Sequence, residues 1–149
     1  MNRQSKGISL KKINVTDRFL KREMELARTE VIPYQWEALN DNVDGAEPSF
    51  CMRNFKLAAK LGEKRRTLGQ ESLPVWTTEE FNLVPEKGKP MEDRFYGFVF
   101  QDTDFSKWIE AVGYSLAAHP DPELEKLADH AIDIVCAAQY EDGYLDTFY

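Results

Sequence analysis

A short segment near residue 145 combines carboxylates with a tyrosine in a pattern suited to binding a sugar. Asp142, Tyr144 and Asp146 alternate with Gly143 and Leu145 just after an apolar helical stripe. Carboxylates accept hydrogen bonds from sugar hydroxyl groups, and a tyrosine ring can stack on the apolar face of a sugar. Gly143 permits a positive φ angle, so the segment can equally be a helix end followed by a polar turn. The local sequence leaves both interpretations open.

Two further carboxylates, Asp102 and Asp104, stand two residues apart where a helix is expected to begin. Such a pair can perform acid–base catalysis when the surroundings raise the pKa of one member. Acidic side chains are also common in the first turn of a helix, where they cap amide groups and complement the helix dipole. Capping is the commoner role and is our interpretation. Gln101 adds an amide directly before the pair.

The cysteines and histidines form no metal-binding or nucleophilic motif. Cys51 and Cys136 are far apart in the sequence, and both fall in apolar helical patterns typical of buried thiols. His119 and His130 each lack a second ligand at metal-binding spacing. Zinc spacings and the common nucleotide-binding and hydrolase motifs are absent from the sequence. We therefore assign no catalytic residue, metal ligand or cofactor within this chain.

Charge and hydropathy argue against two classes of partner. The 149 residues carry a formal net charge of −7, whereas nucleic-acid binding depends on clustered lysine and arginine. The one compact basic run, Lys64-Arg65-Arg66, lies among acidic residues and is typical of a solvated segment. No apolar run approaches the roughly 20 residues that span a bilayer, and residues 1–12 lack an apolar signal-peptide region. We predict no nucleic-acid partner, no membrane partner and a cytoplasmic location.

The spacing of apolar residues predicts an all-α chain that begins with a short extended arm. Residues 8–15 alternate apolar and polar types, which is typical of a strand or an extended segment. Thr16 is expected to cap a first helix, with Asp17 in its first turn. Pro33 should kink or divide that helix because proline lacks an amide hydrogen.

Ser49 is expected to cap a second helix, and Gly62 is expected to end it. The helical pattern is then lost over residues 63–89, which contain charges, prolines and scattered aromatic residues. Long irregular segments within a domain are usually mobile or functional, and surface insertions vary most. We interpret residues 63–89 as a loop insertion.

The last third of the sequence predicts a helical hairpin. A helix from about Asp104 carries two apolar stripes and should pack on both sides, with Trp108 and Tyr114 in the core beside Trp36. The turn His119-Pro120-Asp121-Pro122 stops this helix, caps the next and supplies its first residue. The next helix is expected to end at Gly143. Two amphipathic helices and a short turn form an αα-hairpin.

Six blocks of the sequence, in this order, resemble one family of carbohydrate-active enzymes. They are Ile32-Pro33-Tyr34-Gln35-Trp36, Asn54-Phe55-Lys56-Leu57-Ala58-Ala59, Phe98-Val99-Phe100-Gln101-Asp102-Thr103-Asp104, Lys107-Trp108-Ile109-Glu110-Ala111, His119-Pro120-Asp121-Pro122-Glu123-Leu124 and Asp142-Gly143-Tyr144-Leu145-Asp146-Thr147. Each block is short, but six blocks in order are specific together. The chain resembles the N-terminal part of glycoside hydrolase family 127, the β-L-arabinofuranosidases.

This resemblance implies part of an (α/α)6 barrel and a retaining exo-hydrolase that removes terminal β-L-arabinofuranose. It also implies a cysteine nucleophile on a zinc site and an acidic general acid/base, all from later parts of such enzymes. Cys51 and Cys136 do not stand in the family's metal motif, so no catalytic role passes to them. We therefore expect residues 1–149 to be an N-terminal fragment of the catalytic domain, inactive by itself. Its partner would be an arabinose-containing oligosaccharide.

The resemblance also narrows the choice of substrate contacts. In such barrels, loops at one end of the helices converge on the substrate, and the two helices of the hairpin are antiparallel. The loop before the first and the loop after the second therefore share an end. The expected contacts are Gln101, Asp102, Asp142, Tyr144 and Asp146. Two alternatives stay open: a standalone helical module that binds a sugar or a protein, and self-association through exposed apolar helix faces.

Overall fold

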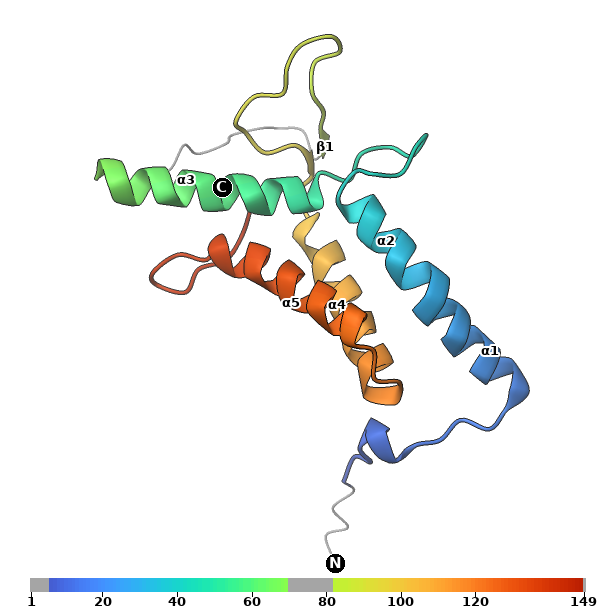
Figure 1. Cartoon of the computed structure of the whole chain (residues 1–149). Coiled ribbons are helices and arrows are strands. Elements are labelled where there is room, and N and C mark those ends of the chain that lie inside the picture. Colours follow the sequence, from blue (N-terminus) through green and yellow to red (C-terminus); the bar gives the residue numbers. More distant parts are fainter. Residues whose placement is uncertain (1–5, 70–81, 149) are drawn as a thin grey trace, which may run out of the picture.

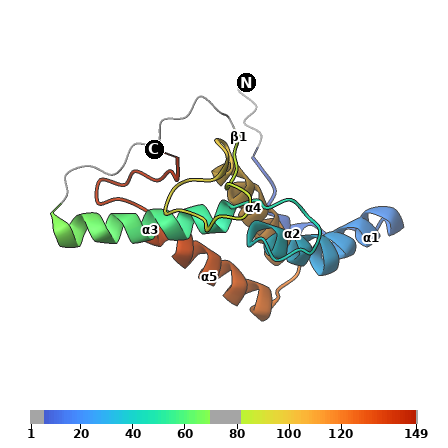
Figure 2. The same ribbon diagram turned by 90° about the horizontal axis from the view of Figure 1, so that it is seen from above.

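The helices of the chain are arranged around a central helical hairpin. The computed structural model describes residues 6–69 and 82–148. Helices α4 (Asp102–Ala118) and α5 (Pro122–Ala137) are joined by a short turn, and α3 (Cys51–Leu68) lies across the end where α4 begins and α5 ends (Figures 1 and 2). A rod made of α1 (Arg18–Leu26) and α2 (Ile32–Leu39) packs against α4 through α2. The all-α prediction is confirmed.

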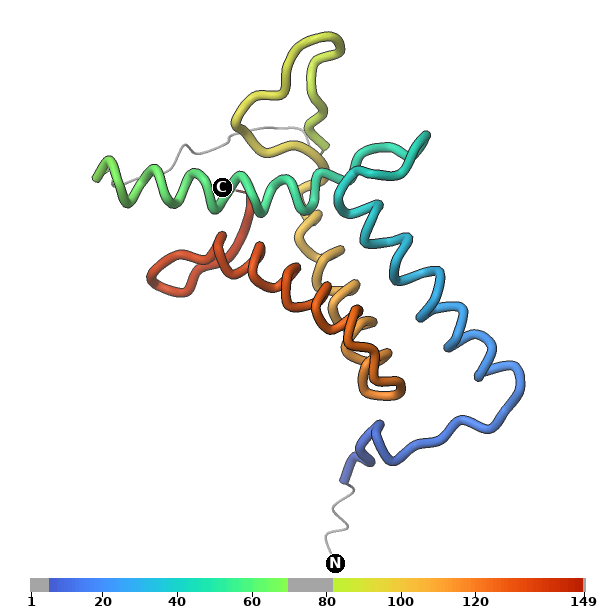
Figure 3. Tube along the Cα trace, viewed as in Figure 1, coloured from blue at the N-terminus to red at the C-terminus, as the bar shows by residue number. Residues whose placement is uncertain are grey.

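The N-terminal arm is extended apart from a single 3₁₀ turn, Leu10–Lys12 (Figure 3). No strand forms over residues 8–15 in the part of the chain that the structure describes, so the strand alternative is wrong. Asp17, rather than Thr16, caps α1: its Oδ1 accepts a hydrogen bond of 2.8 Å from the Leu20 amide. Aspartate and threonine are both good caps, and the backbone turns into the helix one residue later than predicted.

The rod beside α4 is divided where the sequence predicts a disturbance. A π-helical segment, Ala27–Val31, separates α1 from α2, and Pro33 lies in the first turn of α2. Proline cannot donate the hydrogen bond of an interior helical residue, so it is tolerated at a helix start, and the wider turn directly precedes it. The rod continues in one direction through this segment (Figure 3).

Helix α3 is longer than predicted. It continues through Gly62 to Leu68, and Gly69, with φ +63°, ends it. Gly62 instead lies inside the helix, where an added β-carbon would be in ordinary van der Waals contact with the Tyr140 ring, at 3.8 Å. The expected loop over residues 63–89 is therefore wrong for residues 63–68. Residues 70–81 lie outside the described part.

A small two-stranded sheet follows. Strand β1 (Asn82–Leu83) pairs antiparallel with β2 (Gly97–Phe98), with Asn82 opposite Phe98. Between them, the segment just before β2 is fastened to α3 by Asn54, whose Nδ2 donates a hydrogen bond of 2.7 Å to the Tyr96 carbonyl. This fastening places β2, and the turn after it, at the start of α4.

The hairpin begins and ends near the predicted residues. Helix α4 starts at Asp102, two residues before the prediction. The Asp121 cap is confirmed, since its Oδ1 accepts hydrogen bonds from the Glu123 and Leu124 amides at 3.1 and 3.2 Å. Helix α5 ends at Ala137, so the predicted end at Gly143 is wrong.

Trp108 is at the centre of the hydrophobic core. It is 2% exposed, its ring centre is 4.8 Å from that of Trp36, and its Nε1 donates a hydrogen bond of 3.1 Å to the Ile32 carbonyl. The predicted core position of Tyr114 is wrong, because this side chain is 57% exposed. It lines a pocket of about 430 Å³ between α4, the α1–α2 rod and the N-terminal arm.

Apolar side chains also remain exposed on α1, among them Phe19, Leu20 and Met24. Exposed apolar surface of this kind is typical of a face that another element or another molecule covers. Self-association through these residues stays a prediction. Within residues 6–69 and 82–148, no helix has the length and apolar character needed to cross a membrane.

Candidate functional site

The two loops predicted to share an end of the hairpin are in direct contact. Thr147, in the loop after α5, donates its amide hydrogen to Asp102 Oδ2 at 2.8 Å and its hydroxyl hydrogen to Asp102 Oδ1 at 2.5 Å. Asp102 is the first residue of α4. Next to this contact, the Phe148 ring packs edge-on against the buried Phe95 ring, with centres 5.1 Å apart. The loop is thus held to the start of α4 by one polar and one aromatic contact.

The tip of this loop is a compact turn that presents its side chains to solvent. Asp142 Oδ1 accepts a hydrogen bond of 3.0 Å from the Tyr144 amide, and the Tyr140 amide donates to the Tyr144 carbonyl at 2.9 Å. Gly143 has φ +91°, a conformation that favours glycine, and its amide donates to the Tyr140 carbonyl. Asp142 and Tyr144 are both exposed, with Tyr144 at 50%. The turn therefore presents a carboxylate and an aromatic ring together.

Asp102 and Asp104 lie in the first turn of α4, where their charges suit the helix dipole, but neither is the cap residue, which is Gln101 and forms no side-chain cap hydrogen bond. The alternative of an acid–base pair is not supported either, because the two carboxylates have different partners. The charged neighbour of Asp102 is Asp146 from the other loop, whereas Asp104 accepts hydrogen bonds from Gln101 and Lys107. Burial raises the pKa of Asp102 above its ordinary value, the Thr147 hydrogen bonds lower it, and the charge of Asp146 raises it further. Both Asp102 oxygens accept bonds from Thr147, so this carboxyl group serves as an anchor.

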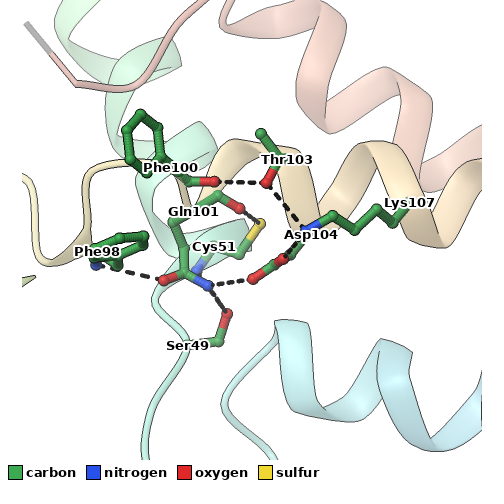
Figure 4. A network of polar contacts seen from close by, with 8 residues as sticks. All are labelled: Ser49, Cys51, Phe98, Phe100, Gln101, Thr103, Asp104 and Lys107. Atoms are coloured by element: carbon green, nitrogen blue, oxygen red, sulfur yellow. Dashed lines mark hydrogen bonds and ion pairs between the residues drawn. The ribbon is translucent and has the colours of Figure 1, made fainter.

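Gln101 joins three segments of the chain (Figure 4). Its Nε2 donates hydrogen bonds to Asp104 Oδ2 at 2.7 Å and to Ser49 Oγ at 3.3 Å, while its Oε1 accepts a hydrogen bond of 3.4 Å from the Phe98 amide. Both amide hydrogens are used inside the protein. Gln101 therefore orients the turn between β2 and α4.

A pocket of about 460 Å³ lies between the second half of α3 and the loop after α5. It is lined by Gly62, Arg65, Arg66, Gly69, Tyr140, Glu141 and Asp142. The Arg65 guanidinium lies 5.3 Å from the centre of the Tyr140 ring, a cation–π distance. Of the five predicted contact residues, Asp142 alone lines this pocket. Gln101, Asp102, Tyr144 and Asp146 lie outside it.

The family description "β-L-arabinofuranosidase, GH127 catalytic domain" matches residues 12–149. The chain belongs to glycoside hydrolase family 127.

Individual relatives agree with this result. A non-reducing end β-L-arabinofuranosidase of Bifidobacterium longum subsp. longum is 37% identical over 137 residues, which are 92% of this chain and 18% of that protein. The crystal structure of a family 127 β-L-arabinofuranosidase from Geobacillus stearothermophilus T6 is 45% identical with a TM-score of 0.67, over 91% of this chain and 17% of that one.

A solved family 127 β-arabinofuranosidase structure is 28% identical with a TM-score of 0.62, over 94% of this chain and 17% of that one. The chain therefore spans less than a fifth of the length of these relatives.

The cysteines of this family 127 chain do not fit a zinc–thiolate site. Cys51 is buried, its thiol donates to the Gln101 carbonyl at 3.4 Å, and burial, with the nearby charges of Asp102 and Asp104, raises its pKa to about 12. A zinc ligand or nucleophile must be a thiolate. Cys136 is exposed, so the prediction that both thiols are buried is wrong for this residue. In residues 6–69 and 82–148, no three His, Cys, Asp or Glu side chains form a group able to hold a metal ion.

The two thiols should differ sharply in reactivity. In the folded protein at pH 8, we expect dithionitrobenzoate to modify Cys136 rapidly and Cys51 barely at all, because the thiolate is the reactive form. With a pKa of about 12, only about one Cys51 thiol in 10⁴ is ionised at pH 8. Absorbance should show one fast equivalent, with the second appearing in urea. Cys136→Ser should abolish the fast phase and Cys51→Ser should preserve it. Two equivalents reacting at one rate in the folded protein would contradict the assignment.

Two residues that fix this end of the hairpin, Thr147 and Asn54, were not predicted from the sequence. Thr147 is 3% exposed and Asn54 is 1% exposed, and the side chain of each forms a hydrogen bond to a residue more than 40 positions away. Only one local signal pointed to Asn54: a polar residue within the apolar pattern of α3, which implies a buried hydrogen-bond partner.

Proposed function

We propose that this chain forms one wall of the substrate site in a β-L-arabinofuranosidase, and that the substrate is an oligosaccharide ending in β-L-arabinofuranose. One observation carries the proposal. In this family 127 chain, the exposed Tyr144 and the carboxylates of Asp142 and Asp102 lie at the same end of a helical hairpin. We place residues 1–149 in the N-terminal part of an (α/α)6-barrel catalytic domain. The function that the relatives' names describe supports this substrate class.

The exposed residues of the loop are the best placed to contact a sugar. The Tyr144 ring can stack on a sugar face, and Asp142, with one oxygen in the turn, can accept a hydroxyl hydrogen bond through its other oxygen. Asp146 is partly buried between Tyr144 and Asp102, and its negative charge raises the pKa of Tyr144. Gln101 and Asp102 stand behind these groups, with their polar atoms engaged inside the protein.

We also propose that this chain alone does not hydrolyse the substrate. Glycoside hydrolysis needs a positioned acid and nucleophile. We propose that the nucleophilic thiol and the zinc ligands of the complete enzyme lie outside this chain, where bound zinc would favour the thiolate form. The buried, protonated thiol of Cys51 supports this assignment. What this chain supplies is binding and orientation of the sugar.

Calorimetric titration of the purified chain with an oligosaccharide that carries terminal β-L-arabinofuranose tests the proposal. Tyr144→Ala should weaken binding by about tenfold, which corresponds to roughly 1.4 kcal/mol of lost stacking. Asp142→Asn keeps an oxygen for the turn and tests the charge of the carboxylate separately. Tyr34→Ala is the matched control, because Tyr34 is also an exposed tyrosine, on α2.

Two results would refute the proposal. One is the absence of binding by a chain that melts cooperatively. The other is turnover of a chromogenic β-L-arabinofuranoside that a substitution within this chain abolishes.

A further inference from the structure

The loop after α5 is attached to the rest of the chain on one side of its tip. Its tip residues are exposed, whereas Thr147 is almost completely buried against Asp102. Each Asp102 oxygen receives one hydrogen from Thr147, so the carboxyl group fixes both the position and the orientation of the backbone there. Thr147 is only three positions after Tyr144, so the backbone between them is too short for the tip to move independently of this anchor.

We propose that Asp102 is a positioning residue: its two hydrogen bonds to Thr147 hold the loop so that Tyr144 and Asp142 face the sugar. This inference rests on the proposed function, and it assigns to Asp102 an effect on binding through the loop rather than through contact with the substrate. We refer to the Asp102–Thr147 contact as the clamp.

Several other titratable groups lie near the carboxyl group of Asp102. Asp146 and Tyr144 face it from the loop, Cys51 faces it from α3, and Asp104 follows it on α4. None of these is a cation, and the two hydrogens of Thr147 stabilise this carboxylate. Removing the carboxyl group therefore leaves the Thr147 amide and hydroxyl without their acceptor.

The clamp should respond to pH in a defined direction. Burial raises the pKa of Asp102 in the docked loop, and opening returns the carboxyl group to water, where its pKa is ordinary. The docked loop thus binds a proton more tightly than the open loop. Docking should strengthen as the pH falls through the raised pKa, reach its maximum below the ordinary pKa, and be weakest and constant above the raised value.

Amide hydrogen exchange of the full chain tests the clamp without any sugar. In Asp102→Ala, we expect the Thr147 amide to exchange about tenfold faster, while amides in the middle of α5 are unchanged. Asp102→Asn keeps an acceptor and can donate to the Thr147 hydroxyl, so it should preserve protection and abolish the pH dependence. Asp129→Ala, an exposed aspartate on α5, is the matched control. Thr147→Val removes only the hydroxyl donor and should also loosen the loop.

Sugar titration of the same variants then separates the two proposals. A positioning role requires that Asp102→Ala weakens binding by about tenfold and that Asp102→Asn restores it to within about threefold. Unchanged Thr147 exchange in both Asp102→Ala and Thr147→Val would overturn the clamp. Faster exchange with unchanged sugar affinity would overturn the positioning role. Faster exchange in a chain whose unsubstituted form binds no sugar would refute the proposed function and leave the clamp standing.

Discussion

Replacing Trp108 by alanine should lower the free energy of unfolding by about 3–5 kcal/mol, the usual cost of truncating a large buried aromatic side chain. Trp108 is nearly inaccessible and contacts the rings of Trp36 and Phe105. Its loss would leave a cavity where α4 meets the α1–α2 rod and remove the donor to the Ile32 carbonyl. Urea unfolding followed by circular dichroism at 222 nm measures the change.

Two comparisons make this result specific. Trp108→Phe retains most of the apolar volume and should cost less than the alanine variant, the remainder reflecting the lost hydrogen bond. Tyr114→Ala, on the same helix but exposed, should change stability by no more than about 0.5 kcal/mol. Equal losses in Trp108→Ala and Tyr114→Ala would show that the core is not centred on Trp108.

Helix start and stop signals within a few residues explain which parts of the fold could be predicted from the sequence. The turn between α4 and α5 follows from Pro120, Asp121 and Pro122, because a helix stop, a cap and a first residue are each decided within a few positions. The end of α3 was not predictable in this way. Gly62 has the character of a stop, but it lies within α3, and Gly69, with φ +63°, ends the helix instead.

The same contrast holds for the candidate site. That both loops lie at one end follows from the antiparallel hairpin alone, and the structure agrees. The hydrogen-bond partner of each carboxylate could not be predicted from the sequence. Asp104 turns to Gln101 and Lys107, while Asp102 meets a threonine 45 positions later, a choice made by tertiary packing of the loop against Phe95.

Asn54→Ala should lower the free energy of unfolding by about 2–4 kcal/mol, because it leaves buried backbone groups of Tyr96 without partners, at about 1–3 kcal/mol each. The Asn54 side chain donates to the Tyr96 carbonyl at 2.7 Å and accepts from the Tyr96 amide at 3.4 Å, as a neighbouring strand would. Urea unfolding gives the magnitude, and hydrogen exchange at Tyr96 should be accelerated beyond what the global change explains.

Arg53→Ala is the matched comparison, since Arg53 fastens the same segment from the same turn of α3. Its guanidinium donates to the Glu92 and Arg94 carbonyls at 2.7 and 3.0 Å, but the side chain is partly exposed. Water can replace a donor at such carbonyls, so this variant should cost only about 1 kcal/mol. If Arg53→Ala cost more than Asn54→Ala, the segment before β2 would be held mainly by the charged guanidinium group at the surface. The stability of the turn that carries Gln101 would then depend on the salt concentration. The amide of Asn54 is buried and neutral, so its hydrogen bonds would give no such salt dependence.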